Sequence, residues 1–556
     1  MQPDTSPPTE RAARLREVHA AVAASDTERA VRLARQALSE GLEEPLLLNL
    51  RAYWYEQQGR ANDALNDLKR ARLLAPDDAF ISNAFGLCLA RLNRSGEARR
   101  AFQDAVKQQS EFAPAHFNLG WISEDLGLLE DARQAFLRAE QLDAGSADPP
   151  ARLAYLAART AEGERARRHA ARALGLEAQH PLAHLALALC EFEDRHLERA
   201  EAHLRQVVVE GRTGSRERAM AHGLLGDCLD AQDKPGEAFA AYTTCNREFA
   251  RLYAPQFRST QLESVPAYLS RIIGYFSAAD ASAWKSKSRT LPETSPVAGH
   301  VFILGFPCSG TTLLEDVLVA HPHVCATGER DGLGGAVRQF LGDPEGMNRL
   351  SGLDWSDLRI FREMYWRELR ESGLAFDGKV LVDNQPYNAA KLPLLTKLFP
   401  DAKILFMSRD PRDIVLSCFR SRFRMSPTNY ELLTLEGAAR LYDGAMRLFE
   451  ILRAKLPLTM VEIPYETLVR DFHNCVVALF RYVGLNPKDA AWDAMERART
   501  RAIATPGAIQ IARGLSSAGI GSWRRYADRL APILPLLQPW IDRFGAAVNQ
   551  GSKGHI

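Results

Sequence analysis

Small apolar residues recur at a fixed spacing through the first half of the chain. Six alanines follow one another at intervals of 34 residues, and a small or apolar residue stands seven positions after each of them. A 34-residue period predicts a repeated pair of antiparallel helices, whose small side chains allow the helices to approach closely. The alanines of the first series are Ala30, Ala64, Ala98, Ala132, Ala166 and Ala200.

This period resembles that of the tetratricopeptide repeat. We count about seven units over residues 11–250, which predicts an all-α solenoid. The resemblance implies a curved array whose groove binds a protein partner. The alternative is an array that only packs against the rest of the chain or mediates self-association.

The second half of the chain follows a different pattern, in which short apolar strands alternate with helices. This alternation predicts an α/β domain with a parallel sheet and helices on both faces. In such domains ligands bind at the carboxyl ends of the strands. Strands are expected at Val301–Leu304, Val380–Val382, Ile404–Met407 and Thr459–Ile463.

A Ser/Thr/Pro-rich stretch separates the two patterns and marks a domain boundary. We therefore expect a repeat array over residues 1–255, a helical connector and linker over residues 256–297, and the α/β domain over residues 298–550. The length of 556 residues agrees with two or more domains.

Composition and charge exclude several classes of protein. The net charge of +1 gives no bulk field that would attract nucleic acid or a membrane surface. Residues Met1 to Arg14 lack the apolar segment of a secretory signal, and the longest apolar runs are too short to span a bilayer. The eight cysteines include no Cys-x-x-Cys pair, which predicts reduced thiols, no zinc site and a cytoplasmic location.

One short segment carries the clearest chemical signal. Residues 303–312 read Ile-Leu-Gly-Phe-Pro-Cys-Ser-Gly-Thr-Thr, which is a strand end, a glycine loop and a helix start. This arrangement aims backbone N–H groups at a phosphate and predicts a P-loop-like motif. Thr311 stands where a P-loop has its lysine, so a kinase or ATPase is disfavoured.

A second segment adds another anion site about 100 residues later. Arg409 follows the strand Lys403–Met407, and Ser417 lies eight residues further on, along the next predicted helix. An arginine fork and a hydroxyl group can together hold one phosphate.

The two segments together resemble the sulfotransferase family, which uses 3′-phosphoadenosine 5′-phosphosulfate (PAPS). The resemblance implies that Arg409 and Ser417 bind the 3′-phosphate and that no metal is needed. It implies that the loop binds the 5′-phosphosulfate through Cys308, Ser309, Gly310, Thr311 and Thr312.

The same resemblance implies further site residues. Glu329, 21 residues after Cys308, corresponds to the base that takes the proton from the acceptor hydroxyl. The alternative is a surface carboxylate paired with Arg330. Tyr465 would lie near the nucleotide, and Trp523 with Arg524 would close over the 3′-phosphate. Without the resemblance, these would be a core tyrosine and the start of an amphipathic helix.

Two family cations are absent from this chain. Cys308 stands where the loop has Lys or Arg, and Asn384 replaces the lysine of an Asp-Lys-x-Pro segment. Losing one charge-stabilising group typically costs about 10²–10³ in rate. Two hypotheses stay open: a PAPS-dependent transferase acting on a hydroxyl acceptor, including one on a protein or peptide, and a catalytically impaired nucleotide-binding scaffold whose repeats are the interaction module.

Overall fold

The computed structural model describes residues 8–211, 214–257, 263–284, 295–328, 330–384, 388–492 and 520–544. The chain divides into two compact units, residues 1–203 and residues 204–556. Among the described residues, no helix is both long enough and apolar enough to cross a membrane.

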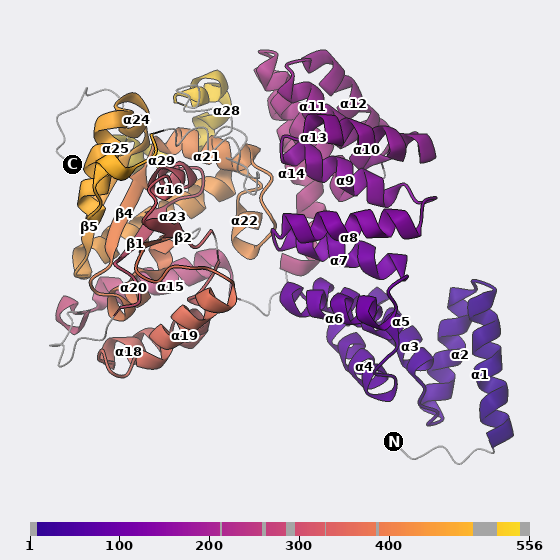
Figure 1. The fold of residues 1–556 in the computed structure, drawn as a ribbon. Helices are drawn as coiled ribbons and strands as arrows, with labels where there is room; N and C mark the ends of the chain where they lie inside the picture. The colour runs from indigo at the N-terminus through magenta and orange to yellow at the C-terminus, as the bar shows by residue number, and fades with distance from the viewer. Residues whose placement is uncertain are drawn as a thin grey trace. The chain divides into compact units, whose positions relative to one another are not determined.

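The first unit is a stack of antiparallel helix pairs (Figure 1). It confirms the all-α repeat solenoid that the 34-residue period predicts. The helices are α1 Pro8–Ala23, α2 Thr27–Ser39, α3 Pro45–Gln57, α4 Ala61–Leu74, α5 Ala79–Arg91, α6 Ser95–Gln108, α7 Ala113–Asp125, α8 Leu129–Leu142, α9 Asp148–Arg159, α10 Gly163–Leu176, α11 Pro181–Glu193 and α12 Leu197–Glu210, which runs past the end of the unit.

The recurring small residues are the places where the helices of a pair touch. All six alanines of the first series lie in the second helix of a pair and have no exposed surface. A Cβ atom at Gly86 would lie 2.6 Å from the Phe102 ring, and one at Gly120 would lie 2.7 Å from the Phe136 ring. The 34-residue period therefore reflects helix packing, because a small residue in one helix leaves room for a large side chain of the partner helix.

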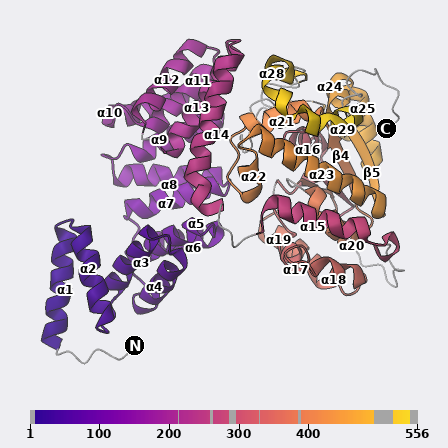
Figure 2. The ribbon, with the colours of Figure 1, turned by 180° about the vertical axis from the view of Figure 1, so that it is seen from behind.

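The second unit begins with one more pair, α13 Arg216–Ala231 and α14 Pro235–Phe257. Gly226 contacts the ring of Tyr242 as the earlier glycines contact phenylalanine. The pair thus continues the repeat in sequence, while it packs with the α/β part of the chain. Helix α15, Val265–Ala278, follows and lies along α23, Leu435–Lys455 (Figure 2).

The centre of this unit is a parallel sheet of five strands in the order β2-β3-β1-β4-β5. The sheet confirms the predicted α/β class and the four predicted strands. The additional strand, β2, has only three residues, too few to show a pattern. The strands are β1 Gly299–Gly305, β2 Val324–Ala326, β3 Val380–Asn384, β4 Lys403–Ser408 and β5 Thr459–Pro464.

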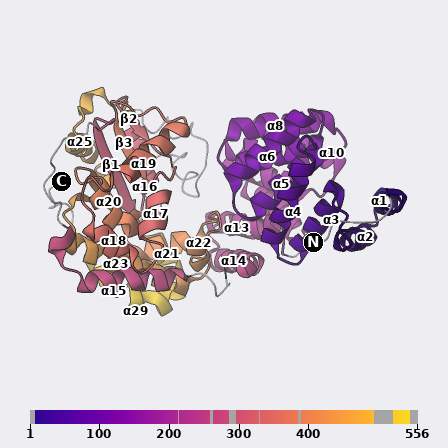
Figure 3. The same cartoon turned by 90° about the horizontal axis from the view of Figure 1, so that it is seen from below.

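Helices cover both faces of the sheet (Figures 1 and 3). Alternate strand residues such as Val301 and Ile303 pack with α16 and α25 on one side. On the other side Phe406 stacks on Phe449 of α23, with ring centroids 3.9 Å apart, and meets Phe544 of α29. Helices α16, α25 and α29 span Thr311–Val319, Phe472–Val483 and Leu534–Phe544.

The unit contains further helices. Among the described residues, the other α-helices are α17 Gly334–Phe340, α18 Gly346–Gly352, α19 Arg359–Glu371, α20 Leu392–Leu398, α21 Pro411–Arg420, α22 Pro427–Glu431, α24 Tyr465–Arg470 and α28 Ala527–Leu530.

Asp230 of α13 connects the last helix pair to the α/β part. Its carboxylate lies 2.7 Å from Arg420 and 2.9 Å from Arg525, and it accepts a 2.6 Å hydrogen bond from the Tyr526 hydroxyl. The Asp230 side chain is only 14% exposed. A partly buried carboxylate with three donors is costly to neutralise, because its partners would keep their charge without compensation.

We expect Asp230→Asn to lower the free energy of unfolding by about 2–4 kcal/mol, because Arg420 loses its counter-charge in a buried setting. Asp233→Asn is the matched control, since Asp233 also pairs with Arg525 but is 90% exposed; its effect should stay below about 1 kcal/mol. Urea unfolding of the two full-length variants measures the difference. Equal losses would contradict a structural role for Asp230.

Candidate active site

The loop between β1 and α16 has a conformation that only glycine allows at one position. Gly310 has a φ of 108°, in the left-handed region. A Cβ atom there would lie 2.6 Å from the ring of Tyr465. Glycine therefore serves both the backbone angle and the close approach of the tyrosine, which follows β5 and packs directly on the loop.

The start of α16 offers several donors to an anion. Thr311 and Thr312 form its first turn and are partly exposed. Ser309 is fully buried, and its Oγ has no hydrogen-bond partner among the residues that the structure describes. The unpaired N–H groups and the dipole of a helix N-terminus stabilise negative charge. These donors fit a phosphosulfate group.

Arg409 reaches the same loop from the neighbouring strand. It directly follows β4, is 6% exposed, and its Nη1 donates a 2.8 Å hydrogen bond to the carbonyl oxygen of Cys308. Its guanidinium also lies 4.6 Å from the centre of the Tyr465 ring. The structure thus brings together three residues that the sequence predicts to bind the nucleotide, from three different strand ends.

One turn of helix α21 packs against the loop. Its Cys418 thiol donates to the carbonyl oxygen of Pro307 at 3.3 Å. Ser421, just past the helix end, donates from its Oγ to the carbonyl of Ser417 at 2.8 Å and lies 3.7 Å from the Cys308 sulfur. Ser417 is partly exposed and belongs to this turn, so it lies on the part of α21 that adjoins the loop.

Asp413, buried in the first turn of α21, holds a distant segment in place. Its carboxylate accepts hydrogen bonds from the backbone N–H of Gly521 at 2.7 Å and of Trp523 at 2.9 Å. The indole of Trp523 faces Arg412, 3.8 Å away, and Arg524 lies 5.2 Å from the same ring. The predicted C-terminal site residues are therefore fixed at the N-terminus of α21.

At the second missing family cation, the chain carries an amide bound to a carboxylate. Asn384, at the end of β3, donates a 2.7 Å hydrogen bond from Nδ2 to Glu315 of α16. Both side chains are buried. The position is therefore neutral and turned toward a carboxylate, and it adds no positive charge to the loop.

The predicted base, Glu329, lies outside the described residues. Two described cations, one of which directly follows Glu329 in the sequence, have partners. Arg330 donates from Nη1 to the carbonyl of Thr327 at 2.9 Å, and Lys391 lies 3.4 Å from Asp331. In the part of the chain that the structure describes, no group of three or more His, Cys, Asp or Glu residues could hold a metal ion.

Three residues that contact the site segments could not be identified from the sequence: Asp413, Glu315 and Cys418. Asp413 shows the weak signal of an acidic residue in the first turn of a helix, which alone says only that the helix dipole is balanced. Their partners stand 69 to 111 residues away in the chain. Only the folded arrangement shows these contacts.

Comparison with known proteins agrees with this geometry. Residues 300–489 match the model of the sulfotransferase family. Residues 83–149 match the model of the tetratricopeptide repeat. Both resemblances seen in the sequence are thus confirmed for these segments, and the sulfotransferase match supports a transferase of sulfate groups in the general sense.

Three curated relatives cover parts of the chain. An uncharacterised protein of Aquifex aeolicus (strain VF5) is 24% identical over 260 residues, 45% of this chain and 33% of that protein. A Caenorhabditis briggsae protein named "Putative protein-tyrosine sulfotransferase" is 29% identical over 132 residues, 23% of this chain and 46% of that protein. Human tetratricopeptide repeat protein 7A is 33% identical over 100 residues, 18% of this chain and 12% of that protein. The chain thus spans less than half the length of each.

Two solved structures are similar to part of the chain. A chain of the Cut9–Hcn1 complex of the APC/C has a TM-score of 0.33 at 17% identity, covering 44% of this chain and 49% of that one. PilF of Pseudomonas aeruginosa has a TM-score of 0.32 at 17% identity, covering 38% of this chain and 97% of that one.

We expect Arg409→Ala to weaken binding of 3′-phosphoadenosine 5′-phosphate by about 1.5–3 kcal/mol, because a charge-assisted pair of hydrogen bonds is lost. Titration calorimetry measures the change, and circular dichroism checks that the loop contact to Cys308 is not needed for folding. Arg481→Ala, at an exposed position of α25, is the control and should bind like wild type. Unchanged affinity for Arg409→Ala would remove this residue from the site.

Proposed function

We propose that the chain transfers a sulfuryl group from PAPS to the hydroxyl group of an acceptor. The observation that carries this proposal is the hydrogen bond from Arg409 to the carbonyl of Cys308. It joins the two segments that the sequence predicts for the two ends of the nucleotide. The family match over residues 300–489 supports the type of reaction.

In this proposal each part of the site has one task. Arg409 and Ser417 hold the 3′-phosphate, while Tyr465 packs beneath the nucleotide. Trp523 and Arg524 close over it from the segment that Asp413 anchors. The loop donors that hold the 5′-phosphosulfate are Cys308, Ser309, Gly310, Thr311 and Thr312.

The donor supplies an activated sulfuryl group. The acceptor oxygen bonds to sulfur as the bond between sulfur and the nucleotide's phosphate oxygen breaks, and Glu329 takes the acceptor proton. Negative charge then grows on the departing oxygen, where preorganised donors lower the barrier. Cys308 and Asn384 contribute no positive charge there, which predicts slow transfer.

The same two positions favour the alternative of a nucleotide-binding scaffold. Asn384 is bound to Glu315 and Cys308 is a thiol, whereas the other residues proposed to bind the nucleotide, such as Arg409 and Ser417, match the family pattern. The repeat array would then supply the function as an interaction module. Activity measurements on wild type and lysine variants distinguish the two hypotheses.

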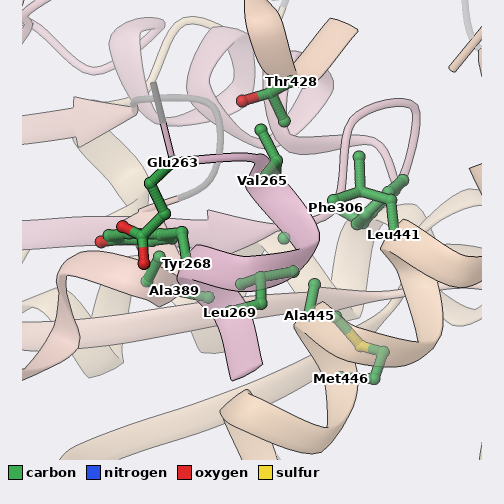
Figure 4. Close-up of a pocket in the computed structure, with 12 residues that line it drawn as sticks. Glu263, Val265, Tyr268, Leu269, Phe306, Ala389, Thr428, Leu441, Ala445 and Met446 are labelled. Carbon is green, nitrogen blue, oxygen red and sulfur yellow. The ribbon is translucent and has the colours of Figure 1, made fainter. Parts of the chain in front are cut away.

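A cavity of about 240 Å³ beside the loop is our candidate for the acceptor site (Figure 4). Gly305 and Phe306 form its boundary with the loop. Its carboxylate, Glu263, is already bound to Arg271 at 2.7 and 2.8 Å. An apolar, compact alcohol or phenol therefore suits it better than an ionic group. The other lining residues are Val265, Tyr268, Leu269, Ala389, Ala390, Thr428, Leu441, Ala445 and Met446.

We further propose that the repeat array binds a protein partner, which is either the acceptor itself or a separate protein. Its arginines are not a free basic surface, because several form ion pairs within the array. Examples are Arg91 with Glu56 at 2.6 Å and Arg99 with Asp131 at 2.5 Å. The proposal therefore does not depend on attraction between a basic surface of the array and an acidic peptide.

Restoring the missing cations tests whether the domain is an impaired enzyme. We expect the double variant Cys308→Lys, Asn384→Lys to raise sulfate transfer by about tenfold or more, since each lost charge costs about 10²–10³. The assay is radiolabelled transfer from PAPS to a panel of alcohols, phenols and peptides. The Glu329→Gln variant should lose transfer and keep nucleotide affinity. Binding without any transfer, in wild type and double variant alike, would favour the scaffold.

Filling the cavity tests the acceptor site separately. Ala445→Leu should raise the KM for an apolar acceptor about tenfold, because it takes up space that the acceptor needs, and should leave nucleotide affinity unchanged. Arg440→Leu adds a leucine at an exposed position of the same helix and serves as control. An unchanged KM in Ala445→Leu would place the acceptor elsewhere.

A further inference from the structure

Two thiols meet where the family carries a cation. Cys308 lies in the loop with a φ of 66°, a conformation that few non-glycine residues adopt. Cys418 of α21 donates from its thiol to the carbonyl oxygen of Pro307, the residue before Cys308, at 3.3 Å. The Cys308 sulfur lies 3.7 Å from the hydroxyl of Ser421, just past the end of the same helix. The two cysteines therefore lie on adjoining segments, one in the loop and one in the helix that packs against it.

The two cysteines differ in access and reactivity. Cys308 is partly exposed, whereas Cys418 has no exposed surface. Hydrogen bonding from Cys418 lowers the pKa of the Cys308 thiol, and the positive charge of Arg409 acts in the same direction. Burial raises the pKa of Cys418. Cys308 is therefore the more accessible and the more acidic of the two thiols.

The other cysteines lack this combination. Each of them is buried. Burial raises the pKa of Cys88, Cys190, Cys245, Cys325 and Cys475, which makes these thiols poor nucleophiles.

We propose that Cys308 and Cys418 form a reversible disulfide under peroxide and that this bond closes the loop to nucleotide. The Cys308 thiolate attacks one peroxide oxygen, the O–O bond breaks, and the second oxygen leaves as water after taking a proton. The Cys418 thiol then attacks the sulfenic sulfur of Cys308, and the hydroxyl group leaves with the thiol proton as a second water. Two thiols are oxidised and one peroxide is reduced.

The bond would act on the site through two segments. It draws Cys308 away from Ser421 and onto α21, next to Ser417. The backbone of residues 307–309, which supplies the loop donors, would have to follow. Because the effect on nucleotide rests on the proposed function, the disulfide and its consequence need separate measurements.

The first measurement treats the full-length protein with hydrogen peroxide and then alkylates the remaining thiols. Peptide mass spectrometry should find Cys308 linked to Cys418, with the loss of two hydrogens, and dithiothreitol should reverse it. Bound 3′-phosphoadenosine 5′-phosphate should slow the reaction, because it covers Cys308. In Cys418→Ser no such link forms, whereas the control Cys475→Ser should behave like wild type. Failure to find the link would overturn the proposal.

The second measurement compares nucleotide affinity before oxidation, after oxidation and after reduction by calorimetry. We expect the disulfide form to bind at least about tenfold more weakly, and reduction to restore binding. A disulfide with unchanged affinity would overturn the closing of the loop. If the reduced protein binds no nucleotide, the proposed function fails, while the mapped disulfide still decides whether the two thiols are a redox pair.

Discussion

The candidate site depends on the parallel pairing of β1 with β4. Gly305 lies opposite Met407 in this register, so both strands end at the same edge of the sheet. The glycine loop and Arg409 then meet although about 100 residues separate them. Strand pairing of this kind is stabilised along its whole length by backbone hydrogen bonds and a shared apolar core, which makes the edge a rigid platform for charged side chains.

Much of this platform could be predicted from the sequence. Period and alternation indicate the repeat array, four strands and the P-loop-like segment, because packing imposes these patterns on neighbouring residues. The contacts from Asp413 to residues 521–523 and from Asn384 to Glu315 could not be predicted. They join distant parts of the chain through single side chains, and a single polar residue produces no periodic pattern in the sequence. The role of Glu329 stays a prediction.

The neighbours of Cys308 bear on why a cysteine occupies this position of the loop. The Cys308 sulfur lies 3.7 Å from the Ser421 hydroxyl, where α21 packs against the loop. A cysteine matches this neighbour in size and hydrogen bonding. The change at Cys308 is therefore accommodated by the packing of α21 and is not an isolated loss of charge.

The anchoring of the last helix pair has a consequence for how the chain can vary. Asp227 and Asp230 tie α13 to Arg422 and Arg420, next to the turn that carries Ser417. Each earlier repeat is stabilised mainly by its neighbours. Repeats before α13 can therefore be added, removed or exchanged without loss of these ion pairs. The final pair, in contrast, must keep Asp227 and Asp230. The array can thus vary in length at its N-terminal end, whereas the pair α13 and α14 at its C-terminal end is held by these contacts.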